Sequence, residues 1–177
     1  MIDWAKNKNG IITASWHVTV PKNFASYNVG DKVDYSQATY SVKDDNGNYV
    51  SDFDTSKAII EGEKEYEYYM ACLETLAASI KRLQDENIPI ILRPLHEAEG
   101  GGGEEGSWFW WGKSGSAVYK ELWKLTYKTL TEDYGLHNII WEWNSYAYST
   151  SANWYPGDEY VAVSYTHLRA HETLRHL

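Results

Sequence analysis

Side chains capable of acid–base chemistry lie together in the middle of the chain. Residues 88–95 form an almost continuous apolar run that contains Arg93 and leads directly into His96 and Glu97. Such a run is typical of a strand buried on both faces, as in a parallel sheet covered by helices. Because side chains alternate along a strand, Arg93, Leu95 and Glu97 are expected on one face. A carboxylate and a guanidinium are costly to bury unless paired, so the sequence predicts either a functional site or a simple ion pair of Arg93 with Glu97.

Aromatic side chains follow this strand directly. Glycines occupy positions 100–103, and residues 108–111 read Trp-Phe-Trp-Trp. Sugars stack on flat aromatic rings, and cleavage of a glycosidic bond needs a proton donor for the leaving oxygen. A carboxyl group beside aromatic faces therefore indicates carbohydrate hydrolysis. The other acidic residues of the glycine-rich link, Glu99, Glu104 and Glu105, are expected to be solvated.

The rest of the chain alternates between strand and helix patterns. Strands are expected at 11–20, 88–95 and 138–143, with the start of another at 160–163, and amphipathic helices at 63–85 and from Ser114 or Ser116 to about 134. Repeated βα units predict a parallel sheet, and functional residues at strand ends favour a (β/α)8 barrel. A whole barrel takes roughly 250 residues. We therefore predict an α/β fold, an incomplete (β/α)8 TIM barrel with about three to four of eight βα units, over residues 1–163.

The long segment 23–54 lacks a helical period, and loops of that length in compact domains are often functional. It is expected either to form part of a cleft wall at the mouth of the barrel or to be a surface excursion.

Composition excludes several classes of partner. Lys and Arg number 16 against 25 acidic residues, which gives a formal charge of −9. Nucleic acids and anionic membranes both reward a basic surface, so neither is expected as a partner. No apolar run approaches the length of a membrane span. The single cysteine, Cys72, leaves no internal disulfide and no cysteine-rich metal site, and no cofactor is implied.

The motifs resemble those of glycoside hydrolase family 26, chiefly endo-β-1,4-mannanases. The resemblance rests on five segments: RPLHE at 93–97, WFWWG at 108–112, IITASWHVTV at 11–20, NIIWEWNS at 138–145 and WYPGD at 154–158. It covers roughly residues 8–163. The family is typically secreted, so an extracellular location is expected; Met1-Ile2-Asp3-Trp4 shows no signal peptide, which we attribute to a missing N-terminal part.

The resemblance implies a retaining mechanism in which Glu97 is the general acid/base. The family's nucleophile lies on a later strand, beyond Val163, and is expected to be absent from this chain; Glu142, between two tryptophans, is the local alternative. The expected substrate is β-mannan or a related polysaccharide. Alternatives are another family activity, on xylan or mixed-linkage glucan, and a non-catalytic remnant that binds sugar.

The resemblance also assigns substrate-binding residues: His17, Arg93, His96, Trp108, Trp111, Trp143 and Asp158. A lone histidine is more often a core residue, but two at the ends of strands favour binding. Trp111 is expected to be partly structural, and Asp158 has a simple turn role as its alternative.

The C-terminal segment 164–177 differs from the rest. It reads SYTHLRAHETLRHL and holds three of the six histidines. It resembles translated sequencing-adapter read-through rather than a barrel strand, so we predict a non-native tail. His167 and His171 are four residues apart, a spacing that suits a metal site on a helix, but no metal is expected there.

Overall fold

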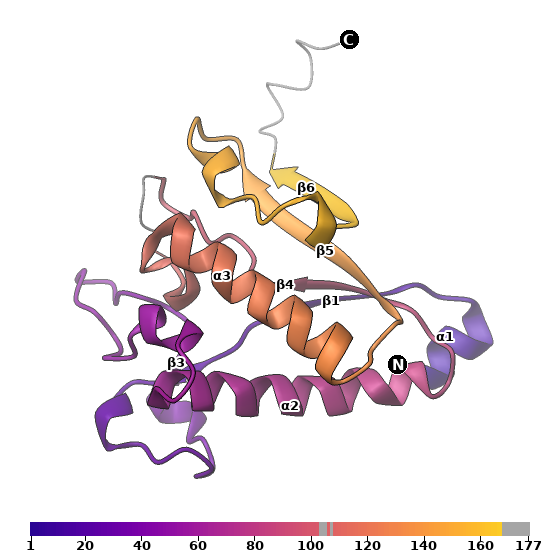
Figure 1. The fold of residues 1–177 in the computed structure, drawn as a ribbon, viewed down its shortest axis with the longest axis horizontal. Helices are drawn as coiled ribbons and strands as arrows, with labels where there is room; N and C mark the ends of the chain where they lie inside the picture. The colour runs from indigo at the N-terminus through magenta and orange to yellow at the C-terminus, as the bar shows by residue number, and fades with distance from the viewer. Residues whose placement is uncertain (103–105, 107, 168–177) are drawn as a thin grey trace.

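The computed structural model describes residues 1–102, 106 and 108–167. Within them, four strands form one sheet in the order β1-β4-β5-β6 (Figure 1). The strands are β1 (Ile12–Trp16), β4 (Ile90–Pro94), β5 (Ile139–Tyr146) and β6 (Val163–His167), and every neighbouring pair is parallel. The predicted α/β class with a parallel sheet is therefore confirmed.

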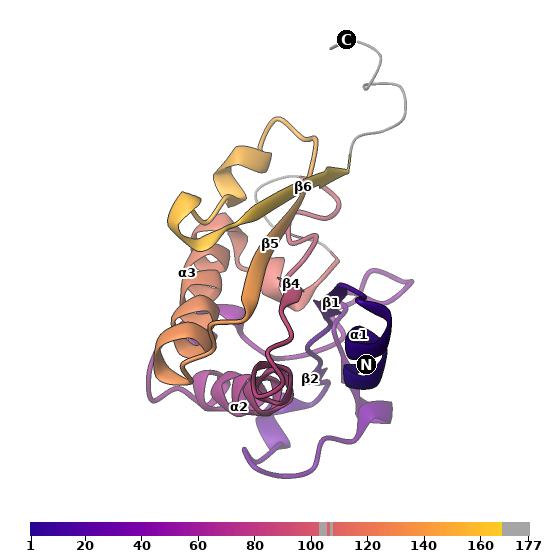
Figure 2. The same cartoon turned by 90° about the vertical axis from the view of Figure 1, so that its right-hand side faces the viewer.

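Two long helices cover one side of this sheet. They are α2 (Lys64–Gln84) and α3 (Gly115–Lys128), which continues into a π-helical turn at Thr129–Asp133; Figure 2 shows both on the same side. Their buried side chains recur at helical spacing, as Tyr69, Leu73 and Ala77 do in α2. A short helix, α1 (Ile2–Lys8), precedes β1.

The opposite side of the sheet is more open. This side carries Thr13, Ile91 and Ile140, which pair in register and alternate along their strands with the residues that face the helices. Ile140 is 38% exposed. In a (β/α)8 barrel this is the side that faces the barrel interior. The described residues supply four of the eight strands of such a barrel, as the sequence predicted.

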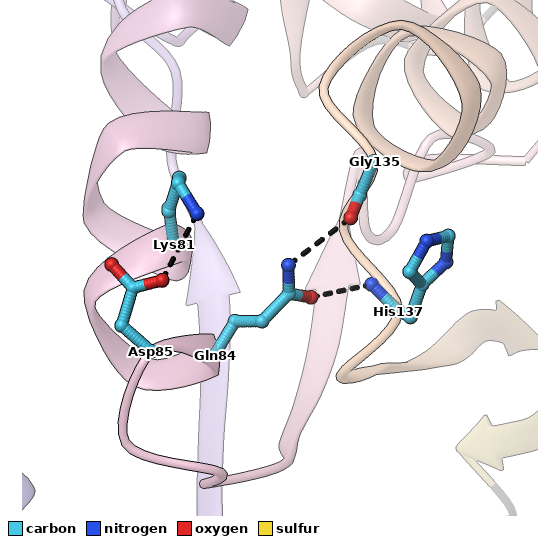
Figure 3. A network of polar contacts seen from close by, with 5 residues as sticks. All are labelled: Lys81, Gln84, Asp85, Gly135 and His137. Atoms are coloured by element: carbon cyan, nitrogen blue, oxygen red, sulfur yellow. Dashed lines mark hydrogen bonds and ion pairs between the residues drawn. The ribbon is translucent and has the colours of Figure 1, made fainter.

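The side chain of Gln84 links the end of α2 to the loop before β5 (Figure 3). Gln84, at the end of α2, donates from Nε2 to the carbonyl of Gly135 at 3.1 Å and accepts at Oε1 from the His137 amide at 2.6 Å. Lys81 and Asp85 form an exposed ion pair beside it. Gly135 has φ +63°, as expected for the glycine that ends a helix. The side chain of Gln84 thus fixes the loop that leads into β5.

The segment 23–54 packs against the aromatic motif. It begins after β2 (Val20–Pro21), which pairs with β3 (Ala38–Thr39) in antiparallel orientation. Beyond β3, the amide of Val42 donates to the carbonyl of Trp108 at 3.0 Å, and the amide of Trp110 donates to the carbonyl of Tyr40 at the same distance. These bonds place residues 40–42 of the segment beside residues 108–110, whereas most of residues 28–37 are exposed. Both the cleft-wall and the surface-excursion interpretations fit this arrangement.

The C-terminal elements differ from expectation in their bounds. β5 continues to Tyr146, and the next strand begins at Val163 because Asp158–Tyr160 forms a 3-10 turn. The proposed boundary between 163 and 164 stays a prediction: β6 runs through 163–167, and residues 168–177, including His171 and His176, lie outside the described residues.

Candidate active site

The chain turns sharply where β4 ends. The strand stops at Pro94, and Leu95 and Glu97 both have left-handed backbone conformations, with φ of +47° and +53°. Non-glycine residues rarely adopt such angles, and they cluster at functional sites. The expectation that Arg93, Leu95 and Glu97 share one face is therefore wrong, because strand alternation ends at Pro94. Leu95 is fully buried, whereas the other two side chains keep part of their surface.

Buried aromatic residues hold this turn through their polar edges. The Trp111 indole donates to the carbonyl of His96 at 2.8 Å, and the Tyr119 hydroxyl donates to the carbonyl of Leu95 at 3.1 Å. Strained backbone persists only when its surroundings fix it. These two bonds supply such support to the peptide groups directly before and after His96, between the two left-handed residues.

Two histidines from neighbouring strand ends meet beside the turn. His17 follows β1, and its Nε2 lies 2.9 Å from Nε2 of His96, with the rings nearly perpendicular. One ring must donate and the other accept, so at least one of them is neutral. Phe109 packs against both rings. His96 is buried, and its Nδ1 has no hydrogen-bond partner among the described residues.

Burial makes the protonation of His96 a source of acid sensitivity. Burial first, and the neighbouring His17 next, lower the pKa of His96 to about 4, although Glu97 acts in the opposite direction. The unfolded chain then binds this proton more readily than the folded one, so stability is complete above about pH 6.5 and declines towards pH 4. The full shift corresponds to roughly 3 kcal/mol of unfolding free energy, and because solvent screens part of this effect we expect about 2 kcal/mol to be lost across that window.

Urea unfolding of the wild type and of His96→Gln at intervals between pH 7 and pH 4 would measure this contribution. The variant should lose distinctly less stability than the wild type as the pH falls. Identical pH dependence of the two proteins would show that His96 does not carry it.

A polar row crosses the open side of the sheet. Arg93 donates from Nε and Nη2 to Ser15 Oγ, at 3.0 and 2.7 Å, and its Nη1 lies 3.5 Å from Oε1 of Glu142. Ser15 is the register partner of Arg93 on β1, and Glu142 comes from β5. Arg93 therefore has an acidic partner on a neighbouring strand, at the level of the site.

An exposed tryptophan and a tyrosine lie close to Glu97. The Tyr146 hydroxyl lies beside the Glu97 side chain, and burial first and hydrogen bonding with Glu97 second raise the pKa of Tyr146. Its ring meets Trp108 edge to face, with centroids 5.5 Å apart. Trp108 is 44% exposed and lies on Gly100, where a Cβ atom would come within 2.6 Å of the indole. A carboxyl group and an open aromatic face thus share one end of the sheet.

Comparison with known proteins identifies the family. The profile of Glycosyl hydrolase family 26 matches residues 1–168. The chain belongs to this family. Two curated relatives are mannan endo-1,4-beta-mannosidases, from Thermothelomyces thermophilus (35% identity, 88% of this chain, 28% of the relative) and, as form A, from Piromyces sp. (35% identity, 81% of this chain, 20% of the relative). The chain thus spans between a fifth and a third of their length.

Solved structures agree with this assignment. A ruminal GH26 endo-beta-1,4-mannanase superposes with a TM-score of 0.87 at 49% identity, over 93% of this chain and 33% of the other. A beta-mannanase from a symbiotic protist of the termite Reticulitermes speratus, complexed with gluco-manno-oligosaccharide, gives a TM-score of 0.74 at 30% identity, over 94% of this chain and 46% of the other. The recognition from sequence motifs is confirmed, and the chain is part of a glycoside hydrolase fold.

Within this family 26 chain, the predicted binding residues divide by exposure. His17 and Trp108 are exposed and Arg93 is half-buried, so each offers surface to a ligand. Trp111 and Trp143 are buried: the first donates to the carbonyl of His96, and the second packs against the Tyr155 ring with centroids 5.1 Å apart. For these two tryptophans the structure favours a role in holding the site rather than direct stacking on sugar.

Asp158 lies apart from this polar row, in the turn that precedes β6. It is exposed and accepts a hydrogen bond from the Tyr155 hydroxyl at 2.7 Å. Both the binding interpretation and the turn interpretation of Asp158 fit this position.

Sequence reasoning missed two contributors to the site and misplaced a third residue. Tyr146 and Phe109 were not selected, although both contact predicted site residues. Glu99, expected to be solvated, is 2% exposed because its carboxylate accepts hydrogen bonds from the end of β5. The same expectation for Glu104 and Glu105 lies outside the described residues.

The described part of the chain contains no group of three or more His, Cys, Asp or Glu side chains arranged to hold a metal ion. None of its helices is long and apolar enough to cross a membrane.

Proposed function

We propose that these residues form the acid/base half of a retaining endo-β-1,4-mannanase site, with Glu97 as the general acid/base. The observation that carries the proposal is the placement of Glu97 at the C-terminal end of β4, in a left-handed turn, beside Tyr146, whose ring packs against the exposed Trp108. Catalytic groups of (β/α)8 enzymes lie at that end of the strands. Membership of family 26 and the names of the relatives support the reaction class.

In this mechanism Glu97 acts twice. It first protonates the glycosidic oxygen as the bond to the leaving sugar breaks, and it then takes a proton from the water that releases the covalent glycosyl-enzyme. A retaining enzyme needs a second carboxyl group about 5–5.5 Å from the first. We propose that this nucleophile belongs to a later strand, beyond Val163. Glu142 is the local alternative, but its contact with Arg93 favours a supporting role.

The remaining predicted residues would bind the sugar at the cleavage point. His17, Arg93 and His96 supply hydrogen-bonding groups on the β1 and β4 side, and Trp108 supplies an aromatic face. We further propose that Trp111 and Trp143 act indirectly, because both are buried, and that Asp158 joins the site from the β5–β6 connection.

Mannan is the preferred substrate for two reasons. The curated relatives are named as mannan endo-1,4-beta-mannosidases, and a structural relative is complexed with gluco-manno-oligosaccharide. An extracellular location follows as part of the same proposal, since mannan is a polysaccharide of cell walls.

The test uses this chain and a chimera. In the chimera, residues 8–163 replace the corresponding segment of the ruminal mannanase, whose remaining strands complete the barrel. The chimera should release reducing sugar from β-mannan and little from xylan or mixed-linkage glucan, whereas the 177-residue chain alone should show negligible turnover. Strong turnover by the chain alone would contradict the missing nucleophile. A chimera that folds but prefers xylan or glucan would contradict the mannan assignment.

A further inference from the structure

Glu99 is a buried carboxylate that the mechanism above does not use. It is 2% exposed; Oε1 accepts from the Ser145 hydroxyl at 2.9 Å and from the Tyr146 amide at 2.5 Å, while Oε2 is buried without a hydrogen-bond partner among the described residues. Burying a carboxylate costs several kcal/mol unless its interactions compensate. A surface role is therefore excluded, and the contacts of Oε1 indicate what the group does.

Glu99 connects two strand ends that the sheet itself leaves separate. The ladder between β4 and β5 ends at the pair Leu92 and Trp141. β5 then continues to Tyr146 with β6 as its only neighbour in the described sheet. Beyond that last pair, Oε1 of Glu99 accepts hydrogen bonds from Ser145 and Tyr146 and so joins the loop after β4 directly to the end of β5. Hydrogen bonds to an ionised carboxylate are short and about twice as strong as neutral ones.

The residue that Glu99 holds is the one that contacts the proposed acid/base. The hydroxyl of Tyr146 lies beside the Glu97 side chain, and its ring packs against Trp108. Its carbonyl accepts from the Ser151 hydroxyl at 2.7 Å. The backbone of Tyr146 is thus fixed on its amide side by Glu99, and its side chain extends into the site.

We propose that Glu99 is a positioning residue that anchors Tyr146 so that the tyrosine hydroxyl meets Glu97 and the tyrosine ring supports Trp108. The assignment rests on the proposed role of Glu97. A tyrosine hydroxyl both donates and accepts. One fixed geometry therefore serves Glu97 as a carboxylate, to which Tyr146 donates, and as a carboxylic acid, from which Tyr146 accepts.

The first test follows the placement of Tyr146 in the 177-residue chain and needs no catalysis. Nuclear Overhauser effects between the rings of Tyr146 and Trp108 are compared in the wild type, Glu99→Leu and Glu99→Gln. Leu keeps most of the buried volume but accepts no hydrogen bond, whereas the amide oxygen of Gln still accepts. The effect should disappear in Glu99→Leu and persist in Glu99→Gln. The nuclear Overhauser effect between the buried rings of Tyr119 and Trp154 shows whether the core is intact. Glu121→Gln changes an exposed glutamate and serves as the control, in which both effects should persist.

Either of two results would overturn the proposal: the Tyr146–Trp108 effect persists in a folded Glu99→Leu protein, or it is lost in a folded Glu99→Gln protein. If the Leu variant loses the Tyr119–Trp154 contact as well, Glu99→Ala replaces it, and the Gln arm still decides.

The second test uses the chimera. Glu99→Leu should lower kcat on mannan about 10- to 100-fold with KM nearly unchanged, since small displacements of positioning groups cost this much, and Glu99→Gln should restore most of it. An equal loss in both variants would contradict positioning through Oε1. If the unmodified chimera is inactive, the proposed function is contradicted. The nuclear Overhauser test still decides whether Glu99 anchors Tyr146, because it needs no activity.

Discussion

Glu97→Gln is expected to lower mannan hydrolysis by the chimera about 10²- to 10⁴-fold, the usual contribution of general acid–base catalysis. Gln has nearly the same shape and still hydrogen-bonds to the Tyr146 hydroxyl, but it delivers no proton to a leaving sugar. The fall should therefore appear in kcat more than in KM. Initial rates of reducing-sugar release at saturating and limiting mannan would measure both constants.

A substrate with a better leaving group separates the acid from the nucleophile. The aryl alcohol of an aryl β-mannobioside leaves with little need for protonation. Glu97→Gln should therefore form the glycosyl-enzyme from this substrate almost normally and release a burst of the aryl alcohol. Combining Glu142→Gln with Glu97→Gln tests the local alternative, since loss of a nucleophile would abolish that burst. Glu121→Gln, at an exposed carboxylate paired with Lys124, should match the unmodified chimera. Near-normal mannan turnover by Glu97→Gln would refute its assignment.

Local patterns were sufficient to predict the elements that position the site. The apolar run before His96 and the helical spacing of Tyr69, Leu73 and Ala77 both report burial over a few residues, which is the scale on which strand and helix periods operate. They correctly predicted β4 and α2 and their βα order. The end of β4 was predicted less well. Its left-handed turn depends on bonds from Trp111 and Tyr119, which no pattern within the run contains.

The burial of Glu99 was beyond the sequence for a similar reason. Its partners, Ser145 and Tyr146, are 46 and 47 residues further along the chain. A glutamate in a glycine-rich link has no period that separates a solvated carboxylate from an anchored one. The family resemblance did not help either, because it carries roles only to motif positions. The contact between β5 and the β4 loop had to be seen in three dimensions.

Aromatic composition likewise indicated a sugar site without saying which rings face it. Trp108 and Trp111 are three residues apart in one motif, yet the first is 44% exposed and the second fully buried. The difference arises from the glycines. Gly106 and Gly112 both approach the carbonyl of Ala98 so closely that a Cβ atom at either position would come within about 2 Å of it. With this packing, the three aromatic residues that follow Trp108 in the motif are buried.

Trp111→Ala should therefore destabilise the protein by about 3–5 kcal/mol, the usual cost of emptying a buried aromatic site. The ring stacks on Phe109 with centroids 4.5 Å apart, and its indole N–H satisfies the carbonyl of His96. Domains of this size have roughly 5–15 kcal/mol of stability in total, so the variant should be close to unfolding at 37 °C. Urea unfolding followed by circular dichroism would give the difference.

Trp108→Ala is the matched comparison within the same motif. It removes an exposed ring, so its unfolding free energy should stay within about 1 kcal/mol of the wild type, while affinity for manno-oligosaccharides should fall because the open aromatic face is lost. Trp111→Phe should be intermediate, since it keeps most of the packing but leaves the His96 carbonyl without its donor. The opposite ranking, with Trp108→Ala the more destabilised protein, would mean that Trp108 belongs to the core. Its role as the aromatic face beside Glu97 would then have to be abandoned.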